Sequence, residues 1–158
     1  MRILKIYDDL PNLHWVGLDS ELQKQLGDEW QVEFFKIASW TRIEQVYPIE
    51  KETDGTDVNI NEDEIFIFWN YHWGPHQEEL QKQIEQKYLD LIKQGAKIKI
   101  QIYSSYGKYD EDERRLDYYT NLFGKEIVIN NVEKPMHSEY MAKDFARRYA
   151  KRIKAYYK

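Results

Sequence analysis

The chain of 158 residues contains no cysteine. Disulfide bonds, thiolate zinc sites and cysteine nucleophiles are therefore excluded, and a chain without disulfides fits the cytoplasm. Apolar runs are short, and none approaches the ~18 residues that a membrane-spanning helix needs. Residues 1–9 lead directly into a strand pattern without the apolar region of a signal peptide. We therefore expect a cytoplasmic domain with no membrane segment.

An excess of positive charge is also missing. The chain has 23 Lys and Arg against 28 Asp and Glu, a net charge of −5, and a general nucleic-acid binder needs cations that face the phosphates. A local basic patch is still compatible with this total. Lys151, Arg152, Lys154 and Lys158 gather at the end of the last predicted helix, where cations favourably oppose the helix dipole. Binding of nucleic acid or lipid is the alternative explanation of this basic end.

Aromatic residues, in contrast, are abundant. They make up 15% of the chain, with 13 Tyr and 5 Trp, and 42% of all residues are hydrophobic. A chain of this composition and length can bury one substantial core. We therefore expect a single domain over residues 1–158.

The stretch around which the chain is organised runs from Asn61 to Gly95. Its uninterrupted apolar segment, Ile65–Trp69, is typical of a strand that is covered on both faces. A long amphipathic helix is predicted from Pro75 to Gln94, because Pro suits the first helical turn and Gly95 follows as a stop. The loop between this central strand and the helix is where we expect a ligand or partner.

Four further strands and three further helices are predicted around this unit. The expected strands cover residues 3–7, 31–37, 98–102 and 127–129. The expected helices cover residues 15–26, 110–123 and the segment after the N-cap Ser138. The second of these helices starts with Asp110 and Glu113, a pattern that resembles a capping box. The first and last helices each have one apolar face, formed by Trp15, Leu18, Leu22 and Leu26 and by Met141, Phe145, Tyr149 and Ile153. The regular alternation predicts an α/β three-layer sandwich, a flavodoxin-like fold with a five-stranded parallel sheet in the order 2-1-3-4-5.

Two segments fit this scheme less well. Residues 38–59 are irregular, with a short helix predicted near Ile43–Tyr47 and an exposed loop at Lys51–Asp57, which contains an Asp-Gly turn signal. The strand at 98–102 has a polar face formed by Lys97, Lys99 and Gln101. We expect this face to mark a sheet edge or an oligomer contact.

Ligands of such sheets bind beyond the carboxyl ends of the strands. Asp8 and Asp9 follow the first strand and can either hold Mg²⁺ through their carboxylates or form a solvated strand end. Ser104 and Ser105 can bind a phosphate or turn the chain. The segments at the carboxyl ends of the other strands include Asn70–Trp73 and Asn130–Lys134. The predicted ligand-binding residues are Asp8, Asp9, Asn70, Tyr71, Trp73, Ser104, Ser105 and Lys134.

The sequence assigns neither a metal nor a cofactor. His72 and His76 have the spacing of a zinc pair, but His72 precedes the predicted helix and no third ligand is evident, so we expect no metal site there. No Gly-rich phosphate fingerprint is present. The segment Leu10–Trp15 also lacks the Ser, Thr and Gly of a flavin phosphate loop, which argues against a flavodoxin proper.

The chain resembles the receiver domains of two-component response regulators over nearly its whole length. Its first strand ends in the acidic pair Asp8-Asp9, Lys134-Pro135 matches their Lys-Pro after strand five, and Ser104 or Ser105 stands at their Ser/Thr switch position. Their phospho-accepting Asp is replaced, since the corresponding segment reads Phe68-Trp69-Asn70. The resemblance implies a pseudo-receiver that acts by binding.

The chain also resembles TIR domains, which share this topology. Many of them carry a Trp after a central strand and, four residues later, a catalytic Glu that opens a helix. Here Trp73 precedes Glu78 and Glu79 with the spacing displaced by one or two residues. This resemblance implies cleavage of the N-glycosidic bond of NAD, with Glu78 or Glu79 as the catalytic carboxylate and with Trp73 and Tyr71 shaping the pocket. The ordinary explanation of both glutamates is that the helix dipole favours carboxylates in the first turn.

From these observations we expect a signalling or regulatory module. It would bind a nucleotide or a protein partner at the carboxyl edge of the sheet, with little catalysis of its own. The alternative is a TIR-like enzyme that cleaves NAD or a related nucleotide. A homo-oligomer is compatible with either function.

Overall fold

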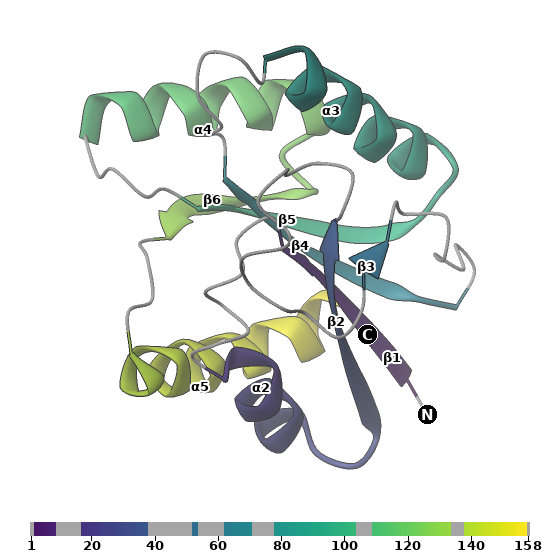
Figure 1. The fold of residues 1–158 in the computed structure, drawn as a ribbon, viewed down its shortest axis with the longest axis vertical. Coiled ribbons are helices and arrows are strands. Elements are labelled where there is room, and N and C mark those ends of the chain that lie inside the picture. The colour runs from purple at the N-terminus through teal and green to yellow at the C-terminus, as the bar shows by residue number, and fades with distance from the viewer. Residues whose placement is uncertain are drawn as a thin grey trace.

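The computed structural model describes residues 2–8, 17–37, 52–53, 62–70, 78–103, 109–133 and 138–157. Strands and helices alternate along these ranges (Figure 1). The strands are β1 (Arg2–Asp8), β2 (Trp30–Ile37), β3 (Glu52–Thr53), β4 (Glu64–Asn70), β5 (Lys97–Tyr103) and β6 (Val128–Glu133). The helices are α2 (Leu18–Leu26), α3 (Glu78–Lys93), α4 (Tyr109–Phe123) and α5 (Glu139–Tyr156).

The six described strands form one parallel sheet in the order β3-β2-β1-β4-β5-β6. The five long strands, counted along the chain, run in the order 2-1-3-4-5, so the predicted flavodoxin-like α/β fold is confirmed. The two-residue strand β3 was not predicted. Its residues Glu52 and Thr53 pair with Lys36 and Ile37 of β2, so part of the segment that was expected to be an exposed loop extends the sheet instead.

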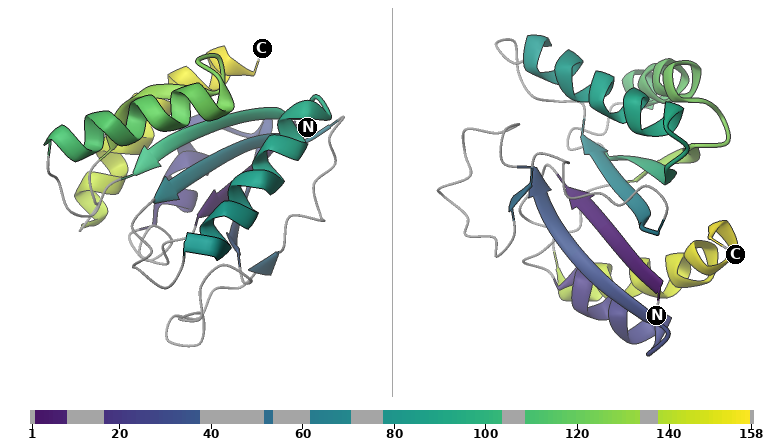
Figure 2. Two further views of the ribbon diagram at one scale, coloured as in Figure 1. Left: turned by 90° about the horizontal axis from the view of Figure 1, so that it is seen from above. Right: turned by 90° about the vertical axis from the view of Figure 1, so that its right-hand side faces the viewer.

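The helices cover both faces of the sheet in pairs. Helices α2 and α5 lie on one face, and α3 and α4 lie on the other (Figures 1 and 2). Such an arrangement follows from parallel strands joined by crossovers, which place helices on the two faces of the sheet. None of the helices in the described ranges is both long and apolar enough to cross a lipid bilayer.

Strand β4 lies in the middle of the sheet, between β1 and β5. Residues Ile65–Trp69 are all at most 1% exposed. Their side chains alternate between the two faces, so that Phe66 and Phe68 belong to the core under α2 and α5, whereas Ile65, Ile67 and Trp69 belong to the core under α3 and α4. The prediction that this strand is covered on both sides is confirmed.

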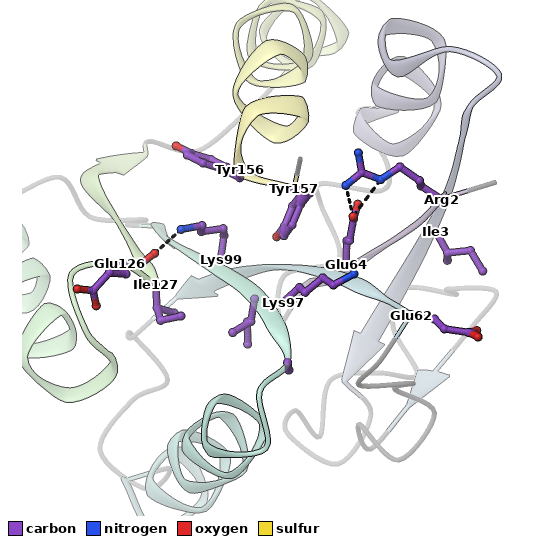
Figure 3. Close-up of a pocket in the computed structure, with 12 residues that line it drawn as sticks. Arg2, Ile3, Glu62, Glu64, Lys97, Lys99, Glu126, Ile127, Tyr156 and Tyr157 are labelled. Carbon is purple, nitrogen blue, oxygen red and sulfur yellow. Dashed lines mark hydrogen bonds and ion pairs between the residues drawn. The ribbon is translucent and has the colours of Figure 1, made fainter.

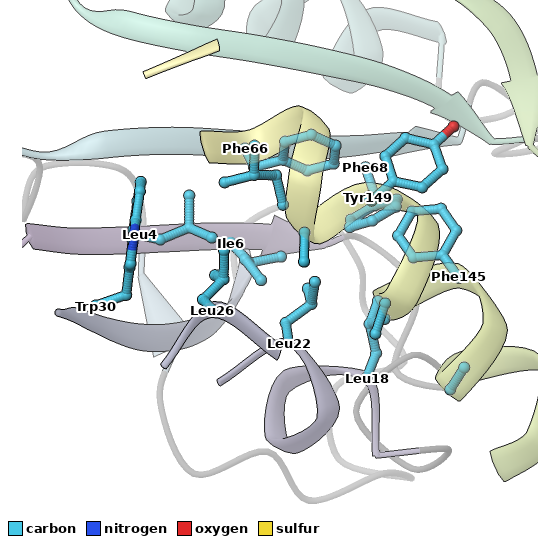
Figure 4. Close-up of a cluster of buried hydrophobic side chains, with 14 of the residues drawn as sticks. Leu4, Ile6, Leu18, Leu22, Leu26, Trp30, Phe66, Phe68, Phe145 and Tyr149 are labelled. Carbon is cyan, nitrogen blue, oxygen red and sulfur yellow. The ribbon is translucent and has the colours of Figure 1, made fainter. Parts of the chain in front are cut away.

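The core on the α2 and α5 face joins these two helices to the strands β1, β2, β4, β5 and β6 (Figure 4). Leu18, Leu22 and Leu26 recur at four-residue intervals and form the buried side of α2, as predicted. They pack beneath Leu4 and Ile6 of β1 in a cluster that also contains Phe145 and Tyr149 of α5. Each such side chain contributes roughly 1.5–3 kcal/mol when it is fully buried, so this cluster holds both helices on the sheet.

The polar face of β5 has a structural explanation that differs from our expectation. Strand β5 lies between β4 and β6 and is not an edge strand. Its polar residues lie on the α5 side, where the Lys99 amine is 5.1 Å from the centre of the Tyr156 ring and also donates to the carbonyl of Glu126. Gln101 is completely buried and hydrogen-bonded. The expected sheet edge is therefore wrong, because β6 pairs with β5 on the side away from β4. An oligomer contact at this face stays a prediction, and Lys97 on it is exposed.

Several helix ends match the sequence signals. The Ser138 side chain accepts a hydrogen bond from the backbone N–H of Met141 at 3.2 Å, which makes it the predicted N-cap of α5. Gly124 follows α4 with a φ of +107°, a value that a residue with a side chain rarely adopts. Helix α4 begins at Tyr109, so Asp110 is its second residue and not the N-cap that the pattern Asp110 to Glu113 predicted.

Candidate functional site

The strand order changes direction between β1 and β4. From β1 the chain moves outward to β2, and it later returns to the other side of β1 to form β4. In open α/β sheets the crevice beyond the carboxyl ends of two such strands is the usual ligand site. Strand β1 ends at Asp8 and β4 ends at Asn70. Asp8 is in register with Phe68, so β4 reaches two residues further than β1 at this crevice.

Helix α3 begins at Glu78, and Glu79 is its second residue. The two candidate catalytic glutamates therefore lie in the first turn of the helix that follows β4. The first helical turn carries a partial positive charge from unpaired backbone N–H groups, which stabilises carboxylates. The backbone position alone fits both the catalytic and the purely structural explanation of these two residues.

Two of the predicted ligand-binding residues, Asp8 and Asn70, lie at the carboxyl ends of neighbouring strands, so their backbones are close together. The other predicted residues lie outside the described ranges, namely Asp9, Tyr71, Trp73, Ser104, Ser105 and Lys134. His72 and His76 lie outside them as well. Within the described ranges, no group of three His, Asp or Glu side chains is arranged to hold a metal ion.

A buried polar network lies near the carboxyl ends of β5 and β6. The hydroxyl oxygen of Tyr149 on α5 lies 3.0 Å from the Oε1 of Gln101 and 3.0 Å from the Oε2 of Glu133. It also accepts a hydrogen bond of 3.3 Å from the Nδ2 of Asn131. Because a hydroxyl has one proton, Tyr149 donates to only one of the two oxygens at a time. The network joins β5, β6 and α5 through one side chain.

The environment of Tyr149 disfavours its ionised form. Burial raises the pKa of the Tyr149 hydroxyl to about 12, the hydrogen bond with Asn131 acts in the opposite direction, and the Glu133 carboxylate adds to the rise. Tyr149 is completely buried. The hydroxyl therefore remains a neutral hydrogen-bond donor at physiological pH.

Gln101 also bridges an irregularity in the sheet. Ile100 pairs with Val128 and Ile102 pairs with Val132, so β6 contains two more residues than β5 between these pairs. The Nε2 of Gln101 donates to the backbone carbonyl of Asn131 at 3.0 Å and to that of Ile102 at 3.1 Å. The side-chain amide thus ties β5 to β6 at the point where the regular ladder is interrupted.

Glu133 ends β6 and lies at the carboxyl edge of the sheet. Its side chain is 15% exposed, and its Oε1 lies 3.5 Å from the Nη2 of Arg148. Arg148 is held in turn by Asp144, one helical turn earlier on α5, at 3.0 Å. These contacts fix the carboxylate of Glu133 at the edge where we expect ligands.

Sequence reasoning included Asn131 and Glu133 only as part of a strand end, and it missed the roles of Gln101 and Tyr149. The available signal was a glutamine among the isoleucines of β5. Its partner Tyr149 is 48 residues away, and the helical pattern of α5 predicted only that Tyr149 faces the core.

A cavity of about 880 Å³ lies at the opposite, amino edge of the sheet (Figure 3). Its walls include Arg2 and Glu64, which form an ion pair, and Tyr156 and Tyr157 at the end of α5. Lys97 and Lys99 contribute from β5. The hydroxyl of Tyr157 donates to the carbonyl of Ile65, and burial, followed by the charge of Glu64, raises the pKa of Tyr157 well above its ordinary value.

The cavity combines charges of both signs. Glu64 is 3% exposed, and its Oε2 has no hydrogen-bond partner in the described part of the chain. A second ion pair, between Lys5 and Asp63 at 2.8 Å, joins the same ends of β1 and β4. The carboxylates of both pairs are buried, although Arg2 is 38% exposed, and each pair links β1 to the start of β4, so we assign them to the fold.

Comparison with known proteins gives little further information. No family model matches the chain, and no curated protein matches it. A solved structure of rubredoxin oxygen:oxidoreductase from the anaerobe Desulfovibrio gigas aligns with a TM-score of 0.48 and 14% sequence identity. That alignment covers 98% of this chain and 36% of the other chain. At this distance the similarity has no bearing on function.

Proposed function

We propose that the chain is a regulatory module that binds a nucleotide in the crevice beyond the carboxyl ends of β1 and β4. The observation that carries the proposal is the reversal of strand order between these two strands. In open α/β sheets the crevice beyond two such strand ends is where ligands usually bind. We therefore place the nucleotide at the ends of β1 and β4.

The residues at these ends suit a nucleotide. A carboxylate, as in Asp8, accepts hydrogen bonds from ribose hydroxyls, and an amide, as in Asn70, both donates and accepts and so can pair with a base edge. In the same proposal Lys134 and the pair Ser104 and Ser105 supply groups for phosphate oxygens. Glu133, fixed by Tyr149 and Arg148, is a further acceptor at this edge of the sheet.

Calorimetric titration of the purified protein with ATP, NAD and ADP-ribose tests this proposal. At least one of the three ligands should bind, and Asp8→Asn or Asn70→Ala should weaken that binding by roughly 10-fold or more, because hydrogen bonds to charged groups contribute about 1.5–3 kcal/mol. Lys97→Gln is the control, since Lys97 lines the cavity at the opposite edge. If Lys97→Gln loses binding and Asp8→Asn retains it, the ligand binds at the amino edge of the sheet, which would contradict the proposal.

The second candidate function is cleavage of the N-glycosidic bond of NAD. It is favoured by the position of Glu78 and Glu79 in the first turn after β4. A carboxylate there could stabilise an oxocarbenium-like transition state. If this function holds, the protein releases nicotinamide from NAD, and one of the variants Glu78→Gln and Glu79→Gln abolishes the release.

The matched control for this assay is Glu113→Gln, an exposed glutamate near the start of α4. It removes the same charge from a helix on the same face of the sheet, and it should leave nicotinamide release unchanged. The assay should include high protein concentrations, because an oligomer is compatible with this function. Absence of release under these conditions would exclude the second candidate and leave the binding function.

A further inference from the structure

Helix α5 has one face in the core and one face in solvent. Its buried residues are Ala142, Phe145, Ala146, Tyr149, Ala150 and Ile153, and they pack against the sheet and against α2 (Figure 4). The other side of the helix lies on the outside of the molecule (Figures 1 and 2).

Four cations form a row on this outer side. Lys143, Arg147, Lys151 and Lys154 are all exposed and follow one another at intervals of four, four and three residues, which places them on one side of a helix. We call these four residues the basic stripe. It extends along roughly 16 Å of the helix axis at 1.5 Å per residue. Tyr140 precedes it by three residues on the same side and is 79% exposed.

The fold makes no use of the basic stripe. Within the described part of the chain, none of its four residues forms an ion pair or hydrogen bond. The neighbouring arginines behave differently, since Arg148 pairs with Glu133 and Asp144, and Arg152 lies 5.1 Å from the Tyr149 ring centre. Cations with a structural role are therefore present on α5, but outside the stripe.

Helix electrostatics does not explain the stripe either. The dipole stabilises cations only in the last turn, which accounts for Lys154 but not for Lys143 in the second turn. Like charges four residues apart destabilise a helix, and the pairs Lys143 and Arg147, and Arg147 and Lys151, have this spacing. Acidic residues offset part of this repulsion, since Glu139 precedes Lys143 by four residues and Asp144 precedes Arg147 by three. No acidic residue of α5 lies within four positions of Lys151 or Lys154, so the positive charge there is not offset within the helix and suits a partner that supplies negative charge.

The charge of the molecule is strongly asymmetric. Helix α5 carries six cations and two carboxylates, a net charge of +4. Because the whole chain has a net charge of −5, the other 140 residues carry −9. A polyanion is therefore attracted to this helix and repelled by the average charge of the remaining residues. The composition argument against nucleic-acid binding applies to the average charge of the chain and not to α5.

We propose that the basic stripe is a docking surface for single-stranded nucleic acid. The four cations contact consecutive phosphates of a flexible strand, and the exposed ring of Tyr140 provides a surface on which an unpaired base stacks. A lipid membrane fits less well, because the apolar face of α5 is buried in the core and cannot insert between lipids. The stacking role of Tyr140 favours a single strand over a duplex, whose bases are already stacked.

Fluorescence anisotropy with labelled oligothymidylate and oligouridylate, measured over a series of salt concentrations, tests the proposal. Release of counterions predicts that the logarithm of the binding constant falls with the logarithm of salt concentration with a slope of about −2.8 for four phosphate contacts on a single strand. The variant Lys143→Gln/Arg147→Gln/Lys151→Gln/Lys154→Gln should bind at least 10-fold more weakly and show a slope near zero. Tyr140→Ala should weaken binding roughly 10-fold with little change in slope.

The matched control is Lys24→Gln/Lys82→Gln/Lys93→Gln/Lys125→Gln, which removes four exposed cations from elsewhere in the chain. It changes the net charge by the same amount and should retain most of the binding. Circular dichroism of both variants verifies that they are folded, and Lys143→Arg/Arg147→Lys/Lys151→Arg/Lys154→Arg, which keeps the charge, should bind like the parent chain.

Three results would overturn the proposal. One is a parent chain that binds neither oligonucleotide at the lowest salt concentration. Another is an equal loss of binding in the stripe variant and its control, which would indicate attraction by overall charge only. The third is binding to phosphatidylserine vesicles without binding to oligonucleotides, which would assign the stripe to a membrane surface.

Discussion

Among the single residues that the structure describes, Tyr149 joins three elements through its side chain. One hydroxyl on α5 contacts Gln101 of β5 and both Asn131 and Glu133 of β6. When a buried polar group loses its hydrogen-bond partner, the free-energy cost of its desolvation is no longer offset, and the fold is destabilised. The position of Glu133 at the carboxyl edge, and hence the shape of the proposed ligand site, depends on this side chain together with Arg148.

Tyr149→Phe should therefore reduce stability, because Gln101 and Glu133 lose their hydroxyl partner in a buried position. We expect a loss of about 1–3 kcal/mol in the free energy of unfolding, and a domain of this size loses roughly 2–4 °C in Tm per kcal/mol. Urea unfolding followed by circular dichroism measures the change. Tyr140→Phe removes the same hydroxyl from an exposed tyrosine and should have no effect, so equal effects of both variants would refute this role of Tyr149.

The raised pKa of Tyr149 predicts sensitivity to alkali. Below pH 10 the hydroxyl is protonated in both the folded and the unfolded state and has no effect on the pH dependence of stability. Above about pH 10 the unfolded chain ionises first, because the pKa of Tyr149 in the folded state is about 12. Stability should therefore fall as the pH rises from about 10 towards 12.

Tyr149→Phe removes this contribution, so the fall in stability with pH should be less steep in the variant than in the parent chain. Tyr157, whose pKa is also raised, contributes in the same direction and leaves part of the dependence in place. Unfolding by urea at several pH values from neutral to strongly alkaline measures both curves. Parallel curves for the two proteins would show that Tyr149 ionises equally in the folded and unfolded states.

Among the elements, α5 combines a packing face with a charged outer side. Its buried face contains three alanines, Ala142, Ala146 and Ala150, in the core cluster that also holds the leucines of α2. Small residues at such a contact allow two helices to approach closely, and a larger side chain there has no space. The spacing of α2 and α5 therefore depends on these alanines.

Ala146→Leu should destabilise the fold by about 1–3 kcal/mol, the usual cost of overpacking a close-packed core. Ala155→Leu makes the same change on the same helix at an exposed position and should be nearly neutral. Thermal unfolding of the two variants side by side measures the difference. A stable Ala146→Leu variant would indicate unfilled space between α2 and α5.

The elements differ in how well the sequence predicts them. Ile65–Trp69, the leucines of α2 and the Ser138 cap were predicted correctly, because each signal lies within a few neighbouring residues. Strand β3 has only two residues and therefore no periodic pattern. Strand β6 extends through Asn130 and Asn131, residues that are rare in strands, so the local pattern ended the predicted strand too early.

The candidate site, too, could be predicted only where local sequence patterns or the fold class determine it. The fold class predicted which strand ends share an edge, and Asp8 and Asn70 lie there by backbone position. The contacts that fix Glu133 depend on Tyr149 and Arg148, which follow it by 16 and 15 residues and belong to a helix that packs across the sheet. Such contacts arise from packing between elements, which local sequence patterns do not encode.

For the molecule as a whole, three surfaces now have separate assignments. The carboxyl edge of the sheet is the proposed nucleotide site, the amino edge holds a cavity bordered by structural ion pairs, and the outer side of α5 carries the basic stripe. The first two lie at opposite ends of the same parallel strands. A ligand bound at one edge therefore leaves residues at the other edge undisturbed, which allows the two sites to be distinguished in solution.

Nuclear magnetic resonance titration of the isotope-labelled protein with ATP, NAD and ADP-ribose tests the central claim most directly. We predict that a bound nucleotide shifts the backbone amide signals of Asp8, Asn70, Glu78 and Glu133, whereas those of Arg2, Lys97 and Glu126 remain in place. Shifts confined to the amino edge, or no shift with any of the three ligands, would contradict the proposed site.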